Sequence, residues 1–302
     1  MAVRVYLNHP TQGHREGVKA ALGLLAARED LASLLRGEQV LVKPNCVSSS
    51  RQLAATHAEA LEAVLEFIAG YDPRRIILGE GSAEDTLKAF RNFGYLEVAE
   101  RSGAEVLDLN RDRAVPVTIY DRQGRPRKVP VARTALESVR ASVALPKTHD
   151  TVIVTAAVKN LAVGAIQRPH KWTIHQGYPA INLNIALLAR RLLPHLAVVD
   201  GHVGMEGDGP VSGAPVAHRI ALAGRDPLAI DAICAYLMGF EPTQVGYLVH
   251  TARLGLGEID LAQIEVVGAR LEGARRRYRP HRTYQGQLHW ALPPELSGLL
   301  SP

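Results

Sequence analysis

Four lysines of this chain lie where an ammonium group is unexpected, and each could bind an anion or exchange a proton. Arginine outnumbers lysine by 28 to 7, so the chain uses arginine for most of its positive charge. Lysine offers a compact charge whose pKa responds readily to burial, which a guanidinium group does not. Four of the seven lysines fall at apolar strand ends or in an apolar, helix-like segment: Lys43, Lys147, Lys159 and Lys171. This pattern favours a pocket that handles anions.

Lys159 stands with Asn160 inside the apolar run from Thr151 to Ile166. A charge buried there must be paired, solvated by a cavity or bound to a ligand. The alternative is that the lysine stem packs on the core while its amine reaches water. A single lysine leaves both interpretations open, whereas four lysines in similar settings favour a ligand.

Lys43 and Asn45 flank a proline in the segment Leu41-Val-Lys-Pro-Asn45. The proline fixes a non-helical exit from a strand, so both polar side chains are presented by stiff backbone. Asn45 could instead bond its own backbone in a turn, which is a common role for asparagine. Both roles stay open for Asn45, while the scarcity of lysine favours a functional role for Lys43.

Glu80 lies between two glycines in Leu78-Gly-Glu-Gly-Ser82, where the backbone can approach a ligand closely. Glu80 and Gly81 are therefore candidate ligand-binding residues. The segment lacks the complete G-x-G-x-x-G pattern, so dinucleotide binding is weakly supported. Ser82 is better explained as the cap of a helix that begins at Ala83.

Lys147, His149 and Asp150 come together where a predicted strand gives way to a helix. A histidine titrates near neutral pH and suits proton transfer, while Lys147 could hold an oxyanion or a carboxylate. Asp150 is interpreted as the N-cap of the helix that carries Lys159.

His170 and His175 are five residues apart in a loop that also contains Lys171. Zinc-binding helices place their histidines four apart and use H-E-x-x-H, so no metal site is predicted here. A loop can still bring both histidines to one point, where they would contact substrate or move a proton. A surface location for both is a nearly equal alternative.

The segment from Asp200 to Gly213 contains five glycines in fourteen residues. Such a loop can close over a ligand, with Gly207 and Gly209 providing hinge freedom. Asp200 and Glu206 are then the carboxylates expected in the site.

Apolar strand-like runs alternate with amphipathic helical patterns, which predicts an α/β fold with a largely parallel sheet and helices on both faces. The expected strands are Val3–Leu7, Gln39–Val42, Arg75–Leu78, Glu105–Leu107, Ala141–Ala144, Leu196–Val199 and Ile220–Ala223. The expected helices are Arg15–Leu35, His57–Ala69, Ala83–Phe93, Thr151–Ala165, Ile181–Leu192 and Pro227–Met238. A β-hairpin is expected near residues 115–131, with its turn at Gly124. Because ligands bind at the carboxyl ends of such strands, the polar motifs are expected to form one site.

Residues 1–268 are predicted to form a single α/β body, or two closely packed lobes, followed by a basic tail over residues 269–302. Asp226 before Pro227 predicts a helix N-cap, whereas Asp231 lies one turn further in an apolar helix and has no such simple explanation.

The net charge of +5 arises locally, since residues 270–282 contain six arginines and one glutamate. The rest of the chain is neutral, so nucleic-acid or membrane binding is not expected. The basic run is interpreted as a solvated tail, with contact to phosphate or an acidic partner as the alternative. The start of the chain has no signal-peptide pattern, and no apolar run approaches about 20 residues, which favours a cytoplasmic protein. Two distant cysteines support neither a disulfide framework nor a self-contained iron–sulfur cluster.

Six short motifs follow one another from the second predicted strand to about residue 240. They are Val40-Leu-Val-Lys-Pro-Asn45, Ile77-Leu-Gly-Glu-Gly81, Leu145-Pro-Lys-Thr-His149, Val158-Lys-Asn-Leu-Ala-Val-Gly164, the stretch from Val199 to Pro210, and Asp226-Pro-Leu-Ala-Ile-Asp231. In this order they resemble the domain of unknown function 362 family. Many members of that family carry a ferredoxin-like module or iron–sulfur cysteines, which implies redox chemistry. This chain has neither, so electron transfer would need a redox partner protein.

A looser similarity in fold connects the chain to the lactate racemase type of α/β protein, whose pocket lysines and histidines hold a nickel-containing nucleotide cofactor. That likeness implies hydride or proton transfer beside the carboxylate of an acid. It does not identify a cofactor for this chain.

The sequence therefore predicts an enzyme that binds a small anionic substrate or cofactor at convergent strand ends. In this hypothesis Lys43, Lys147 and Lys159 neutralise a carboxylate or phosphate, and His149 or His175 moves a proton. A partner-dependent oxidoreductase and a non-enzymatic binding protein are the alternatives. The substrate and the oligomeric state do not follow from the sequence.

Overall fold

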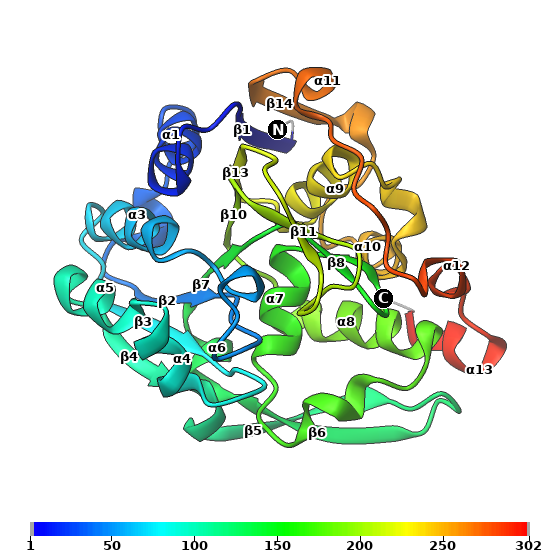
Figure 1. The fold of residues 1–302 in the computed structure, drawn as a ribbon. Helices are drawn as coiled ribbons and strands as arrows, with labels where there is room; N and C mark the ends of the chain where they lie inside the picture. Colours follow the sequence, from blue (N-terminus) through cyan, green and yellow to red (C-terminus); the bar gives the residue numbers. More distant parts are fainter. Residues whose placement is uncertain (1–2, 301–302) are drawn as a thin grey trace.

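An eight-stranded sheet lies at the centre of the computed structural model, which describes residues 3–300 (Figure 1). Its strands lie side by side in the order β14, β1, β13, β10, β7, β2, β3, β4. Among these strands β13 alone runs against the others, since it pairs antiparallel with β1 and with β10. The predicted largely parallel sheet is thus confirmed. The strands are β1 (Val3–Asn8), β2 (Gln39–Pro44), β3 (Arg75–Glu80), β4 (Glu105–Asp108), β7 (Val139–Ala144), β10 (Leu196–Gly201), β13 (Ile220–Gly224) and β14 (Ile264–Gly268).

Helices cover both faces of this sheet, as predicted (Figure 1). Those of the body are α1 (His14–Ala26), α2 (Ala32–Leu35), α3 (Ala58–Ala69), α4 (Thr86–Asn92), α5 (Tyr95–Ser102), α6 (Arg133–Glu137), α7 (Ala157–Gly164), α8 (Tyr178–Leu192), α9 (Pro227–Leu237) and α10 (Gly246–Arg253). Alternate residues of each strand point to opposite faces. In β10, Leu196 and Val198 pack in the core with α1, α3 and α5, while Ala197 and Val199 pack in the core with α7, α8 and α9.

Two smaller sheets accompany the main one. The predicted hairpin is present as β5 (Ala114–Tyr120) and β6 (Pro126–Ala132), with Gly124 at a positive φ of 74° in its turn. A four-stranded sheet in the order β12, β11, β8, β9 was not expected. It comprises β8 (Lys147–His149), β9 (Ile153–Thr155), β11 (Gly204–Glu206) and β12 (Ala214–Val216). This small sheet carries three of the candidate site residues, Lys147, His149 and Glu206.

The predicted helix over Thr151–Ala165 is wrong in its first half. Residues Ile153–Thr155 form β9, and α7 begins only at Ala157. The run Val-Ile-Val-Thr is β-branched and therefore favours a strand. Ile153 also adopts a positive φ of 66°, which no helix tolerates. The local reversal folds β9 back onto β8, where Lys147 pairs with Thr155.

Two other predicted helices are shorter in the structure. The helix expected over Arg15–Leu35 divides into α1 and α2, because the Asp30 carboxylate accepts hydrogen bonds from the N–H groups of Ala32 and Ser33 and starts a new turn. The helix expected from Ala83 begins at Thr86, and Asp85 caps it instead of Ser82.

Asp231 explains how α7 begins without a cap of its own. Its buried carboxylate accepts hydrogen bonds from the N–H groups of Ala157 (2.7 Å) and Val158 (3.1 Å) and from the Tyr247 hydroxyl (3.0 Å). The predicted N-cap, Asp150, makes no such contact, since the residue before α7 is Ala156. Burial raises the pKa of Asp231 to about 7, although these three bonds oppose the rise. Helix α9 thus fixes the start of the helix that carries Lys159.

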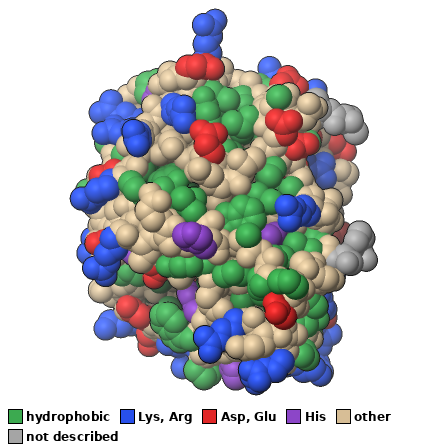
Figure 2. All heavy atoms as spheres, turned by 90° about the vertical axis from the view of Figure 1, so that its right-hand side faces the viewer, with side chains coloured by type: hydrophobic (Ala, Val, Ile, Leu, Met, Phe, Trp, Pro, Cys, Tyr) green, Lys and Arg blue, Asp and Glu red, His purple; other side chains and the backbone are tan. Residues whose placement is uncertain are grey.

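The C-terminal segment folds back over the body. It contains α11 (Leu271–Ala274), α12 (Tyr284–Gln287) and α13 (Pro294–Ser297). The Gln287 amide donates to the carbonyl of His149 (2.8 Å) and accepts from the N–H of Ile153, so it braces the turn between β8 and β9. Figure 2 shows the face that bears this segment, where basic side chains are interspersed with acidic and apolar ones. No helix within residues 3–300 is long and apolar enough to cross a membrane.

We expect Asp231→Ala to destabilise the protein by about 2–5 kcal/mol, because it leaves two buried N–H groups and a buried hydroxyl without an acceptor. Denaturation by urea, followed by circular dichroism, measures the free energy of unfolding. The exposed Asp208→Ala is the control and should change it by no more than about 0.5 kcal/mol. Equal stability of the two variants would mean that Asp231 does not anchor α7.

Candidate functional site

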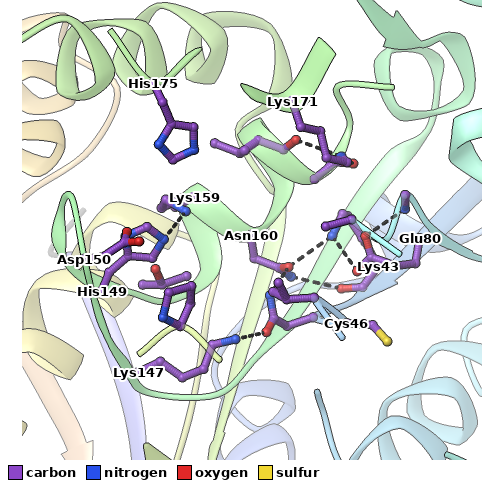
Figure 3. A pocket seen from close by; sticks show the side chains of 18 of the residues that line it. Lys43, Cys46, Glu80, Lys147, His149, Asp150, Lys159, Asn160, Lys171 and His175 are labelled. Atoms are coloured by element: carbon purple, nitrogen blue, oxygen red, sulfur yellow. Dashed lines mark hydrogen bonds and ion pairs between the residues drawn. The ribbon is translucent and has the colours of Figure 1, made fainter. Parts of the chain in front are cut away.

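A cavity of about 150 Å³ lies beside the ends of β2 and β3, between the β8–β9 hairpin and α7 (Figure 3). The structure brings ten of the predicted site residues to its walls. They are Lys43, Asn45, Glu80, Gly81, Lys147, His149, Lys159, Asn160, Lys171 and His175. All four of the unusual lysines therefore meet at one cavity. With the carboxylates of Glu80 and Asp150 also in its wall, the cavity has an excess of two positive charges when every lysine is protonated.

Lys43 is held by the fold itself. An ammonium group has three N–H donors. Those of Lys43 reach a Glu80 carboxylate oxygen at 2.9 Å, the Asn160 side-chain oxygen at 3.0 Å and the Pro44 carbonyl at 3.1 Å. Lys43 and Glu80 are only 1% and 2% exposed. Lys43 thus has no donor left for a ligand in this arrangement.

Gly164 gives Lys43 its space. A Cβ atom at Gly164 would overlap the last methylene and the ammonium of Lys43. A Cβ at Gly81 would lie 2.8 Å from the Gly164 carbonyl oxygen. These two glycines allow β2, β3 and α7 to approach closely, which is a packing role for Gly81 in addition to its place in the cavity wall.

Lys171 caps the end of α7. It lies in the 3₁₀ helix η3 (His170–Ile174), and its ammonium donates to the carbonyls of Val163 (3.2 Å), Gly164 (2.8 Å) and Ile166. Carbonyls at the C-terminus of a helix favour a cation. Burial lowers the pKa of Lys171 to about 7, and the charge of Glu80 opposes that effect. Like Lys43, this lysine has all three donors engaged.

Lys147 has an N–H donor that a ligand could use. Its ammonium donates to the Asn45 side-chain oxygen and to the Ala54 carbonyl (3.3 Å), which leaves one donor without an acceptor among the described residues. Burial, together with the nearby charge of Lys159, lowers the pKa of Lys147 to about 7. This ammonium would therefore gain from an anionic neighbour.

Among the four lysines, Lys159 has the most N–H donors without an acceptor in the described part of the chain. Within residues 3–300 its one hydrogen-bond partner is the His149 Nε2 atom, at 2.9 Å (Figure 3). Burial lowers the pKa of Lys159 to about 8, with Lys43 adding to the effect and Asp150 opposing it. When protonated, Lys159 presents two free N–H donors to the cavity.

The second ring nitrogen of His149, Nδ1, lies near both a hydrogen-bond donor and a hydrogen-bond acceptor. Nδ1 is 3.1 Å from the Thr151 N–H, which needs an acceptor, and 3.0 Å from the Thr151 hydroxyl oxygen, which can accept a hydrogen bond. Asp150 Oδ1 lies 2.9 Å from Nδ1 but forms no hydrogen bond with it. Burial lowers the pKa of His149 to about 3, and the charge of Lys159 adds to this, so the ring is neutral. A neutral ring carries one proton, and either nitrogen can hold it.

His175 also lines the cavity, and Figure 3 shows it on the same side as Lys159 and His149. Burial and the charge of Lys159 lower the pKa of His175 to about 4. Its ring makes no side-chain hydrogen bond to another described residue, so a neutral imidazole is available to a ligand.

Two polar atoms in the cavity wall have no hydrogen-bond partner in the described part of the chain: Thr155 Oγ1 and Asp150 Oδ1. Thr155 is only 4% exposed, and a buried hydroxyl without a partner costs free energy. Thr155 was missed because its segment was assigned to a helix, although its β-branched run was visible in the sequence. Trp172, Cys46 and Pro210 also line the cavity and were not singled out.

Five predicted site residues do not line this cavity. His170 is exposed, Asp200 bonds to His14 at 2.6 Å in a separate cavity, and Glu206 accepts from the Arg279 N–H at 2.9 Å. The glycine-rich loop is tied down where hinges were expected. Gly207 bonds to Arg279, and Gly209 packs against the Thr148 backbone, so these glycines permit close contacts. Within residues 3–300 there is no group of three or more His, Cys, Asp or Glu side chains placed to hold a metal ion.

Two lysine-to-methionine variants should separate the structural lysines from the others. Lys43→Met leaves the buried Glu80 carboxylate unpaired and should destabilise the protein by about 3–5 kcal/mol. Lys159→Met removes a buried charge that has no carboxylate bonded to it and should leave stability equal or raise it by up to about 2 kcal/mol. Guanidinium denaturation at pH 7 measures the free energy of unfolding of both variants. If Lys159→Met is as destabilising as Lys43→Met, Lys159 belongs to a structural ion pair.

The stability gained in Lys159→Met should shrink at high pH. The pKa of Lys159 in the folded chain, about 8, lies below its ordinary value of 10.5. Below pH 8 both states carry the charge and the folded protein bears the full cost of burying it. Between about pH 8 and 10.5 the folded protein alone releases the proton, so wild-type stability rises relative to the variant. A pH-independent difference between the two proteins would contradict the lowered pKa.

Two comparisons place the chain among known proteins. A family model described as Domain of unknown function (DUF362) matches residues 40–236. The chain is also 27% identical over 233 residues to thylakoid-associated protein sll1697 of Synechocystis sp., a match that covers 73% of this chain and 69% of that protein. Neither match supports the looser likeness to lactate racemase. The family match extends over more than half of the chain, from β2 through α9, and includes every lysine of the cavity: this chain belongs to the domain of unknown function 362 family.

Proposed function

We propose that this protein is an enzyme that binds a small anionic substrate between Lys147 and Lys159 and transfers a proton through the Lys159–His149 pair. One observation carries the proposal. Four ammonium groups meet at one cavity. Those of Lys43 and Lys171 donate all three N–H groups to other parts of the protein. Among the described residues, Lys147 keeps one N–H donor without an acceptor, and Lys159 keeps two. A carboxylate or phosphate would supply the missing acceptors.

The energetics favour an anion at this position. Two unit charges 4 Å apart attract by about 4 kcal/mol at an effective dielectric constant near 20. Burial has already removed water from both lysines, which are 0% and 8% exposed, so an anion meets donors that need no further desolvation. The unpartnered Thr155 hydroxyl could donate a further bond to the same oxygen atoms. The arrangement is therefore prepared for negative charge before a ligand arrives.

The contacts around His149 allow the pair to hold or release one proton without moving. When Lys159 is a neutral amine, His149 carries its proton on Nε2, donates it to Lys159 and accepts from the Thr151 N–H at Nδ1. When Lys159 is protonated, it donates to Nε2, and the ring proton lies on Nδ1, where the Thr151 hydroxyl oxygen at 3.0 Å can accept it. Both sets of partners are in place, at distances of 2.9 to 3.1 Å.

This pair suits general acid–base catalysis. A group whose pKa lies near the working pH can both accept and donate a proton, and Lys159 titrates at about 8. A bound anion would raise the pKa of Lys159 and draw a proton onto it. The reaction class that fits is proton transfer at an atom beside the carboxylate or phosphate of the substrate, with the neutral His175 as a second group that could accept a proton.

Calorimetric titration with oxalate and with inorganic phosphate tests the anion site. Lys159→Met and Lys147→Met should each weaken binding by at least about tenfold, because each removes a desolvated cation. Lys128→Met, on the exposed surface of the hairpin, removes the same charge away from the cavity and should leave affinity unchanged. Equal affinity in all three variants would rule out the cavity as the anion site.

The affinity for oxalate should fall as the pH rises through about 7 to 8. The anion binds the protonated lysines, and both lose their protons in this range in the free protein. Oxalate keeps a constant charge there, so the change reports on the protein. Binding should also take up protons from the buffer, which titrations in buffers of different ionisation enthalpy detect. Affinity that stays constant from pH 6.5 to pH 9.5 would contradict the assignment.

A further inference from the structure

A second cavity adjoins the lysine cavity. It has a volume of about 480 Å³ and shares Ala83, Lys171 and Trp172 with the first. Its remaining wall includes Arg111 and Arg168, together with one acidic residue, Asp108. The space available to a ligand therefore continues past Trp172, well beyond what a small carboxylate or phosphate would fill.

Trp172 stands where the two cavities meet, and it is 74% exposed. Its ring lies 5.3 Å from that of His175, at a tilt of 43°. A large aromatic side chain left in water has apolar area to bury and a flat face on which another ring can stack. A ligand with a planar ring would use both properties.

The two arginines provide a second positive centre, separate from Lys147 and Lys159. The Arg111 side chain is 81% exposed, and its Nε lies 3.7 Å from Asp108, which is a weak ion pair. The Arg168 guanidinium forms no ion pair or hydrogen bond with another described residue, although its backbone N–H is held by Asn110 at 3.0 Å. Planar guanidinium groups bind phosphate through paired N–H donors.

We propose that the natural ligand is a two-ended anion of the nucleotide class. Its planar heterocycle stacks on Trp172, its phosphate binds Arg111 and Arg168, and a second anionic group on the ring side reaches Lys147 and Lys159. This inference rests on the proposed function, since the same lysines hold one end of the ligand. It adds a substrate class and assigns a role to a cavity that the lysine site does not include.

Uridine monophosphate and orotidine monophosphate are suitable probes, because they differ by one carboxylate on the ring. Calorimetry should find that orotidine monophosphate binds at least about tenfold more tightly. Lys159→Met should remove this difference and leave the affinity for uridine monophosphate within about twofold. Arg168→Ala and Trp172→Ala should each lower the affinity for both nucleotides by similar factors of at least about fivefold. Arg190→Ala, an exposed arginine on α8, is the matched control and should change neither.

Fluorescence gives an independent readout of the stacking, since the chain has two tryptophans. In a Trp290→Phe protein, emission comes from Trp172 alone, and both nucleotides should quench it, whereas oxalate should not.

Two results would overturn the inference: affinity for orotidine monophosphate no greater than for uridine monophosphate, or nucleotide binding that is insensitive to Arg168→Ala. In the second case, binding that still depends on Lys159 and Trp172 would place the phosphate in the lysine cavity. If oxalate still binds in a Lys159-dependent manner, only this inference is lost. If Lys159→Met leaves oxalate binding intact, the proposed function itself fails.

Discussion

A buried ammonium group needs acceptors for three N–H donors, and this requirement organises the whole site. Burial of unpaired charge is so unfavourable that most proteins avoid it. Here the fold meets the requirement fully for Lys43, through Glu80 and Asn160, and for Lys171, through the carbonyls that end α7. For Lys147 and Lys159 the described residues do not supply acceptors for all three N–H donors. Lys43 and Lys171 therefore stabilise the structure, whereas Lys147 and Lys159 have N–H donors available to a ligand.

The satisfied and unsatisfied lysines are connected by two asparagines. The Asn160 side-chain oxygen accepts from both Lys43 and the Asn45 amide, and the Asn45 oxygen in turn accepts from Lys147. A continuous polar network thus runs from β3 through β2 and α7 to β8. A satisfied network of this kind makes the core around it rigid, and Lys147 is the lysine in it that keeps an N–H donor without an acceptor among the described residues. Asp231 at the start of α7 and Gln287 behind the β8–β9 turn hold the outer parts of this assembly in position.

The sequence predicted the parallel sheet and ten residues of the cavity because strand ends converge in such folds and because lysine is rare in this chain. It could not tell Lys43 from Lys159, since the distinction depends on acceptors contributed by distant segments. Thr155 and Asp231 were obscured for different reasons. A β-branched strand was taken for helix at Thr155, and the cap provided by Asp231 acts across 73 and 74 residues of chain. Asp200 and Glu206 do not line the cavity, because the glycine-rich loop that carries them is packed closely and tied to other segments.

The proposed function requires Lys147 and Lys159 to be buried ammonium groups with N–H donors free for an anion. Nuclear magnetic resonance of protein labelled with ¹⁵N at lysine tests it most directly, because seven lysines give a readily resolved spectrum. These two groups should titrate near pH 7 and 8 in the free protein, and oxalate should move both titrations to higher pH. Lys171, whose donors are bound to carbonyls, should not respond to the anion. If Lys147 and Lys159 titrate at the ordinary lysine pKa of 10.5, or respond to no anion, the proposed anion site is wrong.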